Sequence, residues 1–117
     1  MERLLSAAIN TWNGLVAATR SEEAFRQELV VLGLAIPLAF VITEGSIYAL
    51  TLIAMVLMVM IVELLNTAIE KLSDFVTPAR DDRIKRIKDM GSAAVGLAII
   101  AAGFVWLQAV ATRFGWL

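Results

Sequence analysis

Three long stretches of the chain contain no charged side chain, and each could form a helix that crosses a membrane. They cover residues 29–43, 45–62 and 90–112. A transmembrane helix needs roughly 20 mainly apolar residues. The third stretch has this length, and the second reaches it if its helix continues past Glu63. The first is short and contains Pro37, so it can cross only if its helix begins before Glu28 or if the bilayer thins around it.

The composition agrees with a membrane protein. Of the 117 residues, 60% are hydrophobic, whereas soluble domains contain about 45–50%. The chain has no Cys and no His, which excludes a disulfide framework, a zinc finger, a thiol nucleophile and a Ser-His-Asp triad. Its net charge of -1 provides no basic field for nucleic acid. We therefore expect one all-α integral-membrane domain over residues 1–117, with spans at about 26–43, 46–72 and 88–112, and no nucleic-acid partner.

A fourth uncharged stretch, residues 4–19, differs from the others because its apolar side chains share one face of a helix. A helix of this kind lies in the plane of the membrane surface. We expect it at about residues 2–20, with Trp12 at the depth of the lipid headgroups. A secretory signal peptide is a poor alternative, because the stretch contains two Asn residues and no clear cleavage site follows it.

The distribution of Lys and Arg predicts the orientation in the membrane. All of them except Arg113 precede the first expected span or lie between the second and the third. Positive charges collect in the short loops on the cytoplasmic side. The N-terminus and residues 71–88 are therefore expected in the cytoplasm, and the C-terminus outside.

One face of the second expected span carries polar side chains. Glu63, Asn66 and Glu70 have the spacing i, i+3, i+7, which places them on the same side of a helix. A polar stripe on a membrane helix should face protein or water rather than lipid. A contact between helices through hydrogen bonds is one interpretation. The two carboxylates favour a cation-binding or catalytic site instead.

A second group of charged residues precedes the first span, over residues 21–28. Ser21 could cap a helix, and Glu23 in a first helical turn would favour the positive end of the helix dipole. Glu22 and Arg26, at i and i+4, could form a surface ion pair of small energetic value. Glu28 is harder to explain structurally, because it opens the shortest apolar stretch.

A third group lies at the start of the third span. Residues 83–88 are basic, and Lys88 and Asp89 stand where the apolar stretch begins. Gly91, Ser92 and the other small residues that follow allow close approach of helices, so we expect an oligomer. Together the three groups provide carboxylates, an amide and cations, which are the parts of a phosphoryl-transfer site. Because the chain has no glycine-rich phosphate loop, phosphates would bind through a metal and side chains.

Three motifs connect these groups with a known family. They are E-A-F-R-Q-E at 23–28, V-E-L-L-N-T-A-I-E at 62–70 and K-D-M-G-S-A-A-V at 88–95. Their combination resembles the small prokaryotic integral-membrane diacylglycerol kinases, over nearly the whole chain. The resemblance implies a homotrimer in the bacterial inner membrane, with active sites shared between neighbouring subunits. It also implies direct in-line transfer of the γ-phosphate of ATP to diacylglycerol, giving phosphatidic acid, with Mg²⁺ as the cofactor.

The resemblance also implies roles for individual residues. Glu63 matches the general base, and Asn66 matches an orienting residue beside it. Glu22 and Glu70 match the carboxylates that bind the metal together with ATP. Residues that match further nucleotide contacts are Arg3, Asn10, Lys88 and Asp89. Residues that match the lipid site, in addition to Glu63, are Trp12, Phe25, Arg26, Gln27, Glu28 and Ser92.

The chain departs from the family pattern at two places. Asn10 stands where enteric relatives carry a Tyr near the nucleotide. Residues 77–86 differ from their acidic loop, and the R-I-K-R-I-K-D string at 83–89 is similar to members that phosphorylate undecaprenol. An undecaprenol kinase is therefore one alternative. A non-catalytic membrane scaffold or small ion carrier is another, although it does not explain the polar stripe.

Overall fold

A computed structural model describes residues 1–116 as four helices and the short segments that join them. The helices are α1 (Glu2–Ser21), α2 (Glu23–Ile42), α3 (Ser46–Val76) and α4 (Asp82–Arg113), and residues 1–116 contain no strand. By length and composition, α2, α3 and α4 could each cross a membrane. The expected all-α architecture of one amphipathic helix and three membrane helices is confirmed.

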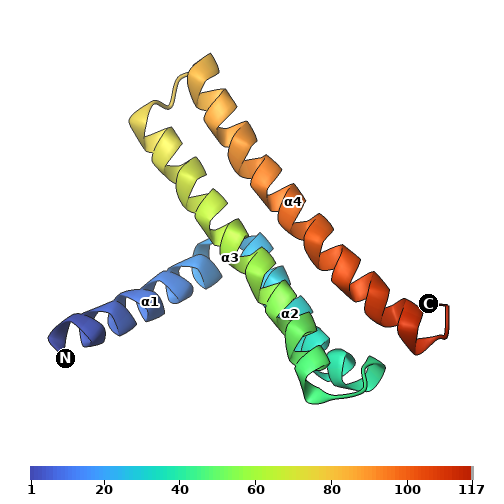
Figure 1. Ribbon diagram of the computed structural model, residues 1–117. Coiled ribbons are helices and arrows are strands. Elements are labelled where there is room, and N and C mark those ends of the chain that lie inside the picture. Colours follow the sequence, from blue (N-terminus) through green and yellow to red (C-terminus); the bar gives the residue numbers. More distant parts are fainter. Residues whose placement is uncertain (117) are drawn as a thin grey trace.

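The first span begins before Glu28, as its short apolar stretch requires. α2 has 20 residues, or roughly 30 Å at 1.5 Å per residue. α3 and α4 have 31 and 32 residues, or roughly 46–48 Å, which exceeds the hydrocarbon thickness of about 30 Å. Both extend beyond the ranges expected from apolarity, because their charged ends remain helical. Figure 1 shows α3 and α4 leading away from the loop that joins them, and α2 lying along the half of α3 remote from that loop.

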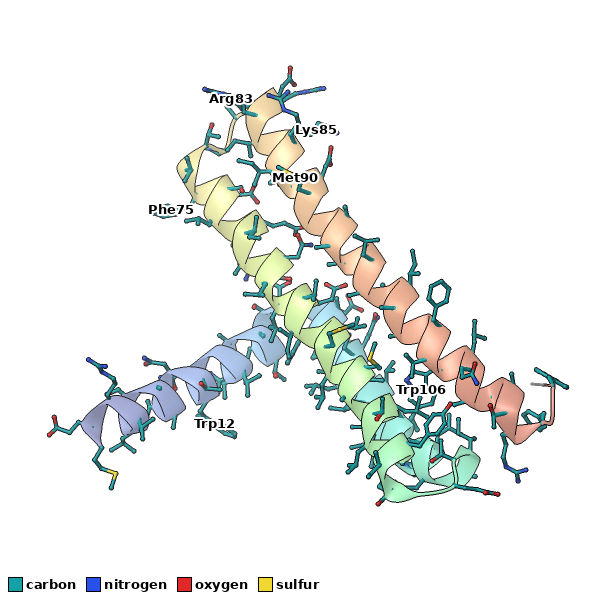
Figure 2. The ribbon with its side chains drawn as sticks, viewed as in Figure 1. Trp12, Phe75, Arg83, Lys85, Met90 and Trp106 are labelled. Carbon is teal, nitrogen blue, oxygen red and sulfur yellow. The ribbon has the colours of Figure 1, made fainter. Side chains whose placement is uncertain are left out.

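The surface helix α1 projects away from the other three helices (Figure 1). Its apolar side chains are exposed, and Trp12 is 68% exposed (Figure 2). It packs on the bundle only near its end, where buried Ala18 forms a cluster with Phe25 and Met60. An amphipathic helix whose apolar face is left mostly exposed by residues 1–116 suits the membrane interface.

The junction between α1 and α2 differs from the expectation at two residues. Ser21 is the last residue of α1 and donates its hydroxyl to the Ala17 carbonyl at 2.8 Å, so it does not cap α2. Arg26 does not pair with Glu22. It donates to the carbonyls of Thr19 and Arg20 at 2.9 and 3.2 Å, which satisfies the free carbonyls at the end of α1.

Small side chains bring the three membrane helices together near the 43–45 turn. Ala39, Ala49, Leu52 and Ala109 form a buried cluster there. The Trp106 ring nitrogen donates to the Leu52 carbonyl at 3.1 Å, which joins α4 to α3. Gly45 in the turn has a φ of 97°, a conformation that favours glycine. This packing fixes how α3 and α4 face each other farther along, where the polar residues lie.

Candidate functional site

Asn66, the middle residue of the polar stripe on α3, faces α4 where that helix carries Gly91. Asn66 is buried, with 9% of its surface exposed. Its Nδ2 donates to Oε1 of Glu70 at 3.1 Å. Its Oδ1 is buried without a hydrogen-bond partner in residues 1–116. Asn66 and Glu70 therefore share a face, as their spacing predicts, and the amide orients the carboxylate.

Glu63 lies one turn from Asn66, and a second carboxylate approaches it from α2. Glu63 and Glu28 are both half-buried and close enough for their charges to interact. Oε2 of Glu28 is buried without a hydrogen-bond partner in the described chain. Two carboxylates on facing helices form a polar spot within apolar surroundings, where a hydroxyl group could be bound.

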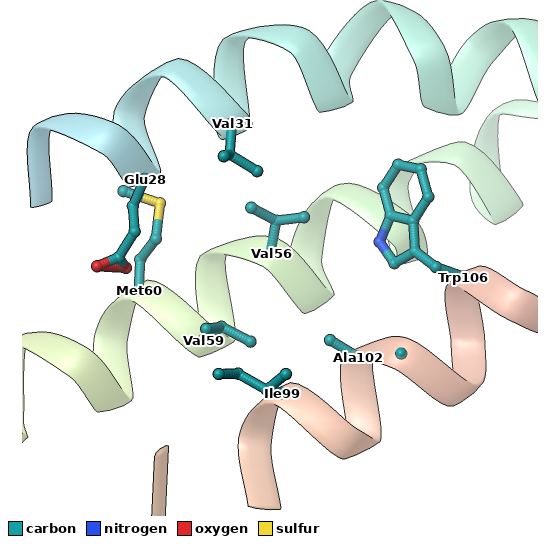
Figure 3. A pocket seen from close by; sticks show the side chains of 9 residues that line it. Glu28, Val31, Val56, Val59, Met60, Ile99, Ala102 and Trp106 are labelled. Atoms are coloured by element: carbon teal, nitrogen blue, oxygen red, sulfur yellow. The ribbon is translucent and has the colours of Figure 1, made fainter. Parts of the chain in front are cut away.

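An apolar cavity of about 300 Å³ begins at Glu28 and runs between α2, α3 and α4. In Figure 3, Glu28 and Met60 lie at one end and Trp106 lies at the other, with aliphatic side chains between them. The carboxylate is the only charged side chain among the residues that line this cavity. One polar end and an apolar length match the shape of a lipid with a polar hydroxyl end.

The charged residues at the other end of α3 form ion pairs. Lys71 pairs with Glu22 at 2.7 Å and so joins α3 to the α1–α2 junction. Lys88 pairs with Asp74 across the α3–α4 loop. Asp89 pairs with Lys85 at 2.7 Å on α4 itself. Lys88 and Asp89, although adjacent in sequence, therefore point to different partners.

A polar cleft of about 500 Å³ lies beside the loop over residues 77–81. Arg80, Lys85 and Lys88 line it together with Asp74 and Asp81. Figure 2 shows Arg83 and Lys85 extending from the start of α4 at this end of the molecule. Cations around an open cleft could bind phosphate groups.

Glu22 and Glu70, the carboxylates expected to bind a metal, have few acidic neighbours. Within residues 1–116, no three acidic side chains are grouped closely enough to hold a metal. Mg²⁺ commonly binds one or two protein carboxylates and takes its other ligands from phosphates and water. Among residues 1–116, Glu70 accepts one side-chain hydrogen bond, which leaves oxygen lone pairs free. The ion pair between Glu22 and Lys71 must break before Glu22 can bind a cation. The chemistry of each carboxylate fits a single ligand to a cation whose other ligands are phosphate oxygens and water.

The other candidates are spread over the chain. Phe25 is 4% exposed and belongs to the core, whereas Gln27 and Ser92 are exposed. Arg3 and Asn10 lie on the part of α1 that projects away, far from the start of α4 (Figure 1). One chain therefore does not bring these two residues to Lys88.

Comparisons with known proteins decide the family. The family model of prokaryotic diacylglycerol kinase matches residues 9–110. The chain belongs to the prokaryotic diacylglycerol kinase family. The diacylglycerol kinase of Escherichia coli (strain K12) is 43% identical over 113 residues, which cover 97% of this chain and 93% of the relative. That of Pseudomonas aeruginosa is 39% identical over 106 residues, covering 91% and 86%. That of Haemophilus influenzae is 37% identical over 106 residues, covering 91% and 90%.

The resemblance seen in the three motifs is thus confirmed. The family match includes every candidate site residue except Arg3, which precedes residue 9. Members of this family are small membrane kinases, so the carboxylates of the polar stripe belong to an enzyme fold.

Several residues at the site were not predicted from the sequence. Asp74 and Lys71 form the pairs that hold Lys88 and Glu22. Trp106 closes the apolar cavity. In the sequence, Asp74 and Lys71 stand out only as charged residues near the end of an apolar stretch. Their partners lie outside α3, so no regular spacing along the sequence predicts the pairs.

Proposed function

We propose that this protein is a lipid kinase that transfers the γ-phosphate of ATP to the hydroxyl of diacylglycerol, giving phosphatidic acid. The observation that carries the proposal is the family match over residues 9–110, combined with relatives of nearly equal length that are named diacylglycerol kinases. The polar stripe and the apolar cavity with Glu28 at one end support it, because a lipid kinase must bring a hydroxyl and a phosphate together at the edge of a membrane.

Glu63 is proposed as the general base. It lies roughly 26 Å along α3 from Ser46 at 1.5 Å per residue, near the far side of the hydrocarbon layer. Glu63 takes the proton from the lipid hydroxyl as that oxygen attacks the γ-phosphorus in line with the leaving group. The bond from phosphorus to the bridging oxygen breaks, and ADP leaves. Glu28 beside it holds the polar end of the lipid, whose chain lies in the apolar cavity.

Lys88 is proposed to bind phosphate oxygens as a point charge. The phosphate would replace Asp74 as the ion-pair partner of Lys88. Glu70, oriented by Asn66, and Glu22 would hold Mg²⁺, which when bound offsets charge on the phosphates. Asp89, Arg3 and Asn10 are the remaining proposed nucleotide contacts. Trp12, Arg26, Gln27 and Ser92 remain proposed lipid contacts at the surface, whereas Phe25 packs in the core against Ala18 and Met60.

A homotrimer with shared active sites is part of the proposal. Most side chains of the three membrane helices are exposed on a single chain, so they must contact lipid or other subunits. Arg3 and Asn10 could reach a phosphate at Lys88 only on a neighbouring chain. The protein is a bacterial inner-membrane protein, and we propose that its N-terminus is cytoplasmic and its C-terminus outside.

The test is phosphate transfer from labelled ATP to diacylglycerol in mixed micelles, with and without Mg²⁺. Glu63→Gln is expected to lower the rate by about 100- to 10,000-fold, the usual contribution of a general base. Glu44→Gln is the matched control, because Glu44 lies in the turn at the opposite end of α3, and it should retain the native rate.

Absence of labelled diacylglycerol in a verified oligomer would contradict the proposed function. Equal rates for native protein and Glu63→Gln would contradict the role of Glu63. A competition with undecaprenol at equal mole fraction distinguishes the two acceptor lipids, and a strong preference for undecaprenol would make that lipid the substrate.

A further inference from the structure

A close approach between α3 and α4 occurs where Gly91 faces Asn66. Gly91 is buried. A Cβ placed on Gly91 would overlap Oδ1 of Asn66 and would lie 3.2 Å from its Cγ. The carboxamide of Asn66 thus occupies the space that any other residue at position 91 would fill. Gly96, on the same helix, would meet no described atom within 4 Å if it carried a Cβ.

The amide of Asn66 cannot turn freely in this position. Its Nδ2 donates to Glu70, whereas its buried Oδ1 accepts no hydrogen bond from residues 1–116. The Oδ1 atom lies against the backbone of Gly91, on the side where the glycine has a hydrogen and any other residue would have its Cβ. A Cα–H group can make a weak favourable contact with such an oxygen. The glycine therefore determines which way the amide points.

We propose that Gly91 is a positioning residue for the kinase reaction. Its missing side chain lets the Asn66 amide lie between α3 and α4, and the amide then holds the Glu70 carboxylate in the orientation needed for the divalent cation. Gly91 itself contacts neither substrate nor cation. The inference about catalysis rests on the proposed function, but the orientation of the Asn66 amide can be measured without any activity.

The central variant is Gly91→Ala, with Gly96→Ala as the matched control on the same helix. Alanine is a better helix former than glycine, so the control should fold and react as the native protein does. In Gly91→Ala the amide must rotate away, and its hydrogen bond to a charged group is lost. We expect the Mg²⁺ concentration at half-maximal rate to rise about 10- to 100-fold, as such a bond predicts. The KM for the lipid should stay within about twofold.

A double-mutant cycle tests whether Gly91 acts through Asn66. Removing the Asn66 side chain beyond Cβ removes the overlap, because that Cβ lies 4.0 Å from the added one. Gly91→Ala should therefore have no further effect on the Mg²⁺ dependence in an Asn66→Ala background. Equal effects in both backgrounds would overturn the proposal. If Gly91→Ala alone does not fold, a folded double variant with the properties of Asn66→Ala supports the proposal, and an unfolded one overturns it.

The second readout is the NMR signal of the Asn66 side-chain amide in ¹⁵N-labelled protein, assigned by its absence in Asn66→Ala. We expect Gly91→Ala to shift this signal and Gly96→Ala to leave it in place. An unchanged signal in Gly91→Ala would overturn the proposal. If native protein shows no kinase activity, the proposed function fails, whereas the NMR comparison still decides whether Gly91 orients Asn66.

Discussion

Charged side chains near the site fall into two kinds, those paired within the chain and those left without a partner. Lys88 and Glu22 are paired with Asp74 and Lys71. Glu28 has one buried carboxylate oxygen without a partner in residues 1–116. The partners Lys71 and Asp74 are 60% and 64% exposed, and ion pairs open to solvent contribute little to stability, so a phosphate or a cation can displace them at small cost. The unpartnered oxygen instead supports the proposal that Glu28 holds the polar end of the lipid.

Asp81 allows a test at the scale of one residue. Its carboxylate accepts from the side chain of Arg83 at 3.0 Å and from the Arg83 backbone N–H at 2.8 Å, which caps α4. These bonds to Arg83 hold the pKa of Asp81 below its usual value. A lowered pKa means that the cap stabilises α4 above the unfolded pKa and is lost as the pH falls through the folded pKa.

We therefore expect the backbone amide signal of Arg83 to titrate below about pH 4, the usual range of Asp. In Arg83→Gln the midpoint should rise towards that range, because the charged partner is gone. Asp81→Asn retains a capping oxygen but has no proton to release. In this variant the backbone amide signal of Arg83 should therefore not titrate. A midpoint that is equal in native protein and Arg83→Gln would contradict this account.

At the scale of the elements, the uncharged stretches were enough to predict one surface helix and three membrane helices. The ends were harder to predict, because α3 continues to Val76 and α4 begins at Asp82, each beyond its apolar stretch. Lys, Arg and Glu are good helix formers in water, so loss of apolarity does not end a helix. The apolar pattern predicts which residues lie in the hydrocarbon layer. The ends of the helices depend instead on Pro78 and the rest of the 77–81 loop.

The same contrast applies to the candidate site. The Asn66–Glu70 hydrogen bond follows from spacing along one helix. The contacts of Lys88 with Asp74 and of Gly91 with Asn66 join two helices. Such contacts depend on how far α4 is shifted along α3, which the five-residue segment 77–81 sets and no local pattern reveals.

The hydrogen bond from Trp106 to the Leu52 carbonyl offers a test of this packing. Trp106→Phe keeps an aromatic ring but removes the donor, and should lower the free energy of unfolding by about 0.5–1.5 kcal/mol. Trp116→Phe is the control, because Trp116 is exposed and should change stability little. Denaturant titration in mixed micelles measures both. Equal stability of the two variants would show that the bond does not contribute.

For the whole molecule, the separation of the candidate residues matters most. α1 carries Arg3 and Asn10 away from the start of α4 (Figure 1), which supports the proposal that neighbouring subunits share each site. Subunit mixing tests this. Glu63→Gln and Lys88→Ala should each be inactive alone. If each site takes these residues from different subunits of a trimer, a one-to-one mixture should regain about a quarter of the native rate.

The mixture must be assembled from unfolded or dissociated chains, and two different affinity tags can verify that the subunits have exchanged. A mixture of two native preparations carrying the same tags is the control for losses during assembly. Verified mixed oligomers that remain inactive would mean that Glu63 and Lys88 act within one chain, and the subunits would then share the site only through residues of α1 such as Arg3 and Asn10.

α3 is continuous from Glu63, the proposed base for the lipid hydroxyl, to Glu70, the proposed ligand of the cation that accompanies the phosphates. Inserting one residue between them would turn one carboxylate by about 100° relative to the other. Side chains along this helix can be substituted one at a time, but the number of residues between the two carboxylates is fixed. Descendants of such a chain can vary in length at the 77–81 loop or at the chain ends, but not between the two carboxylates.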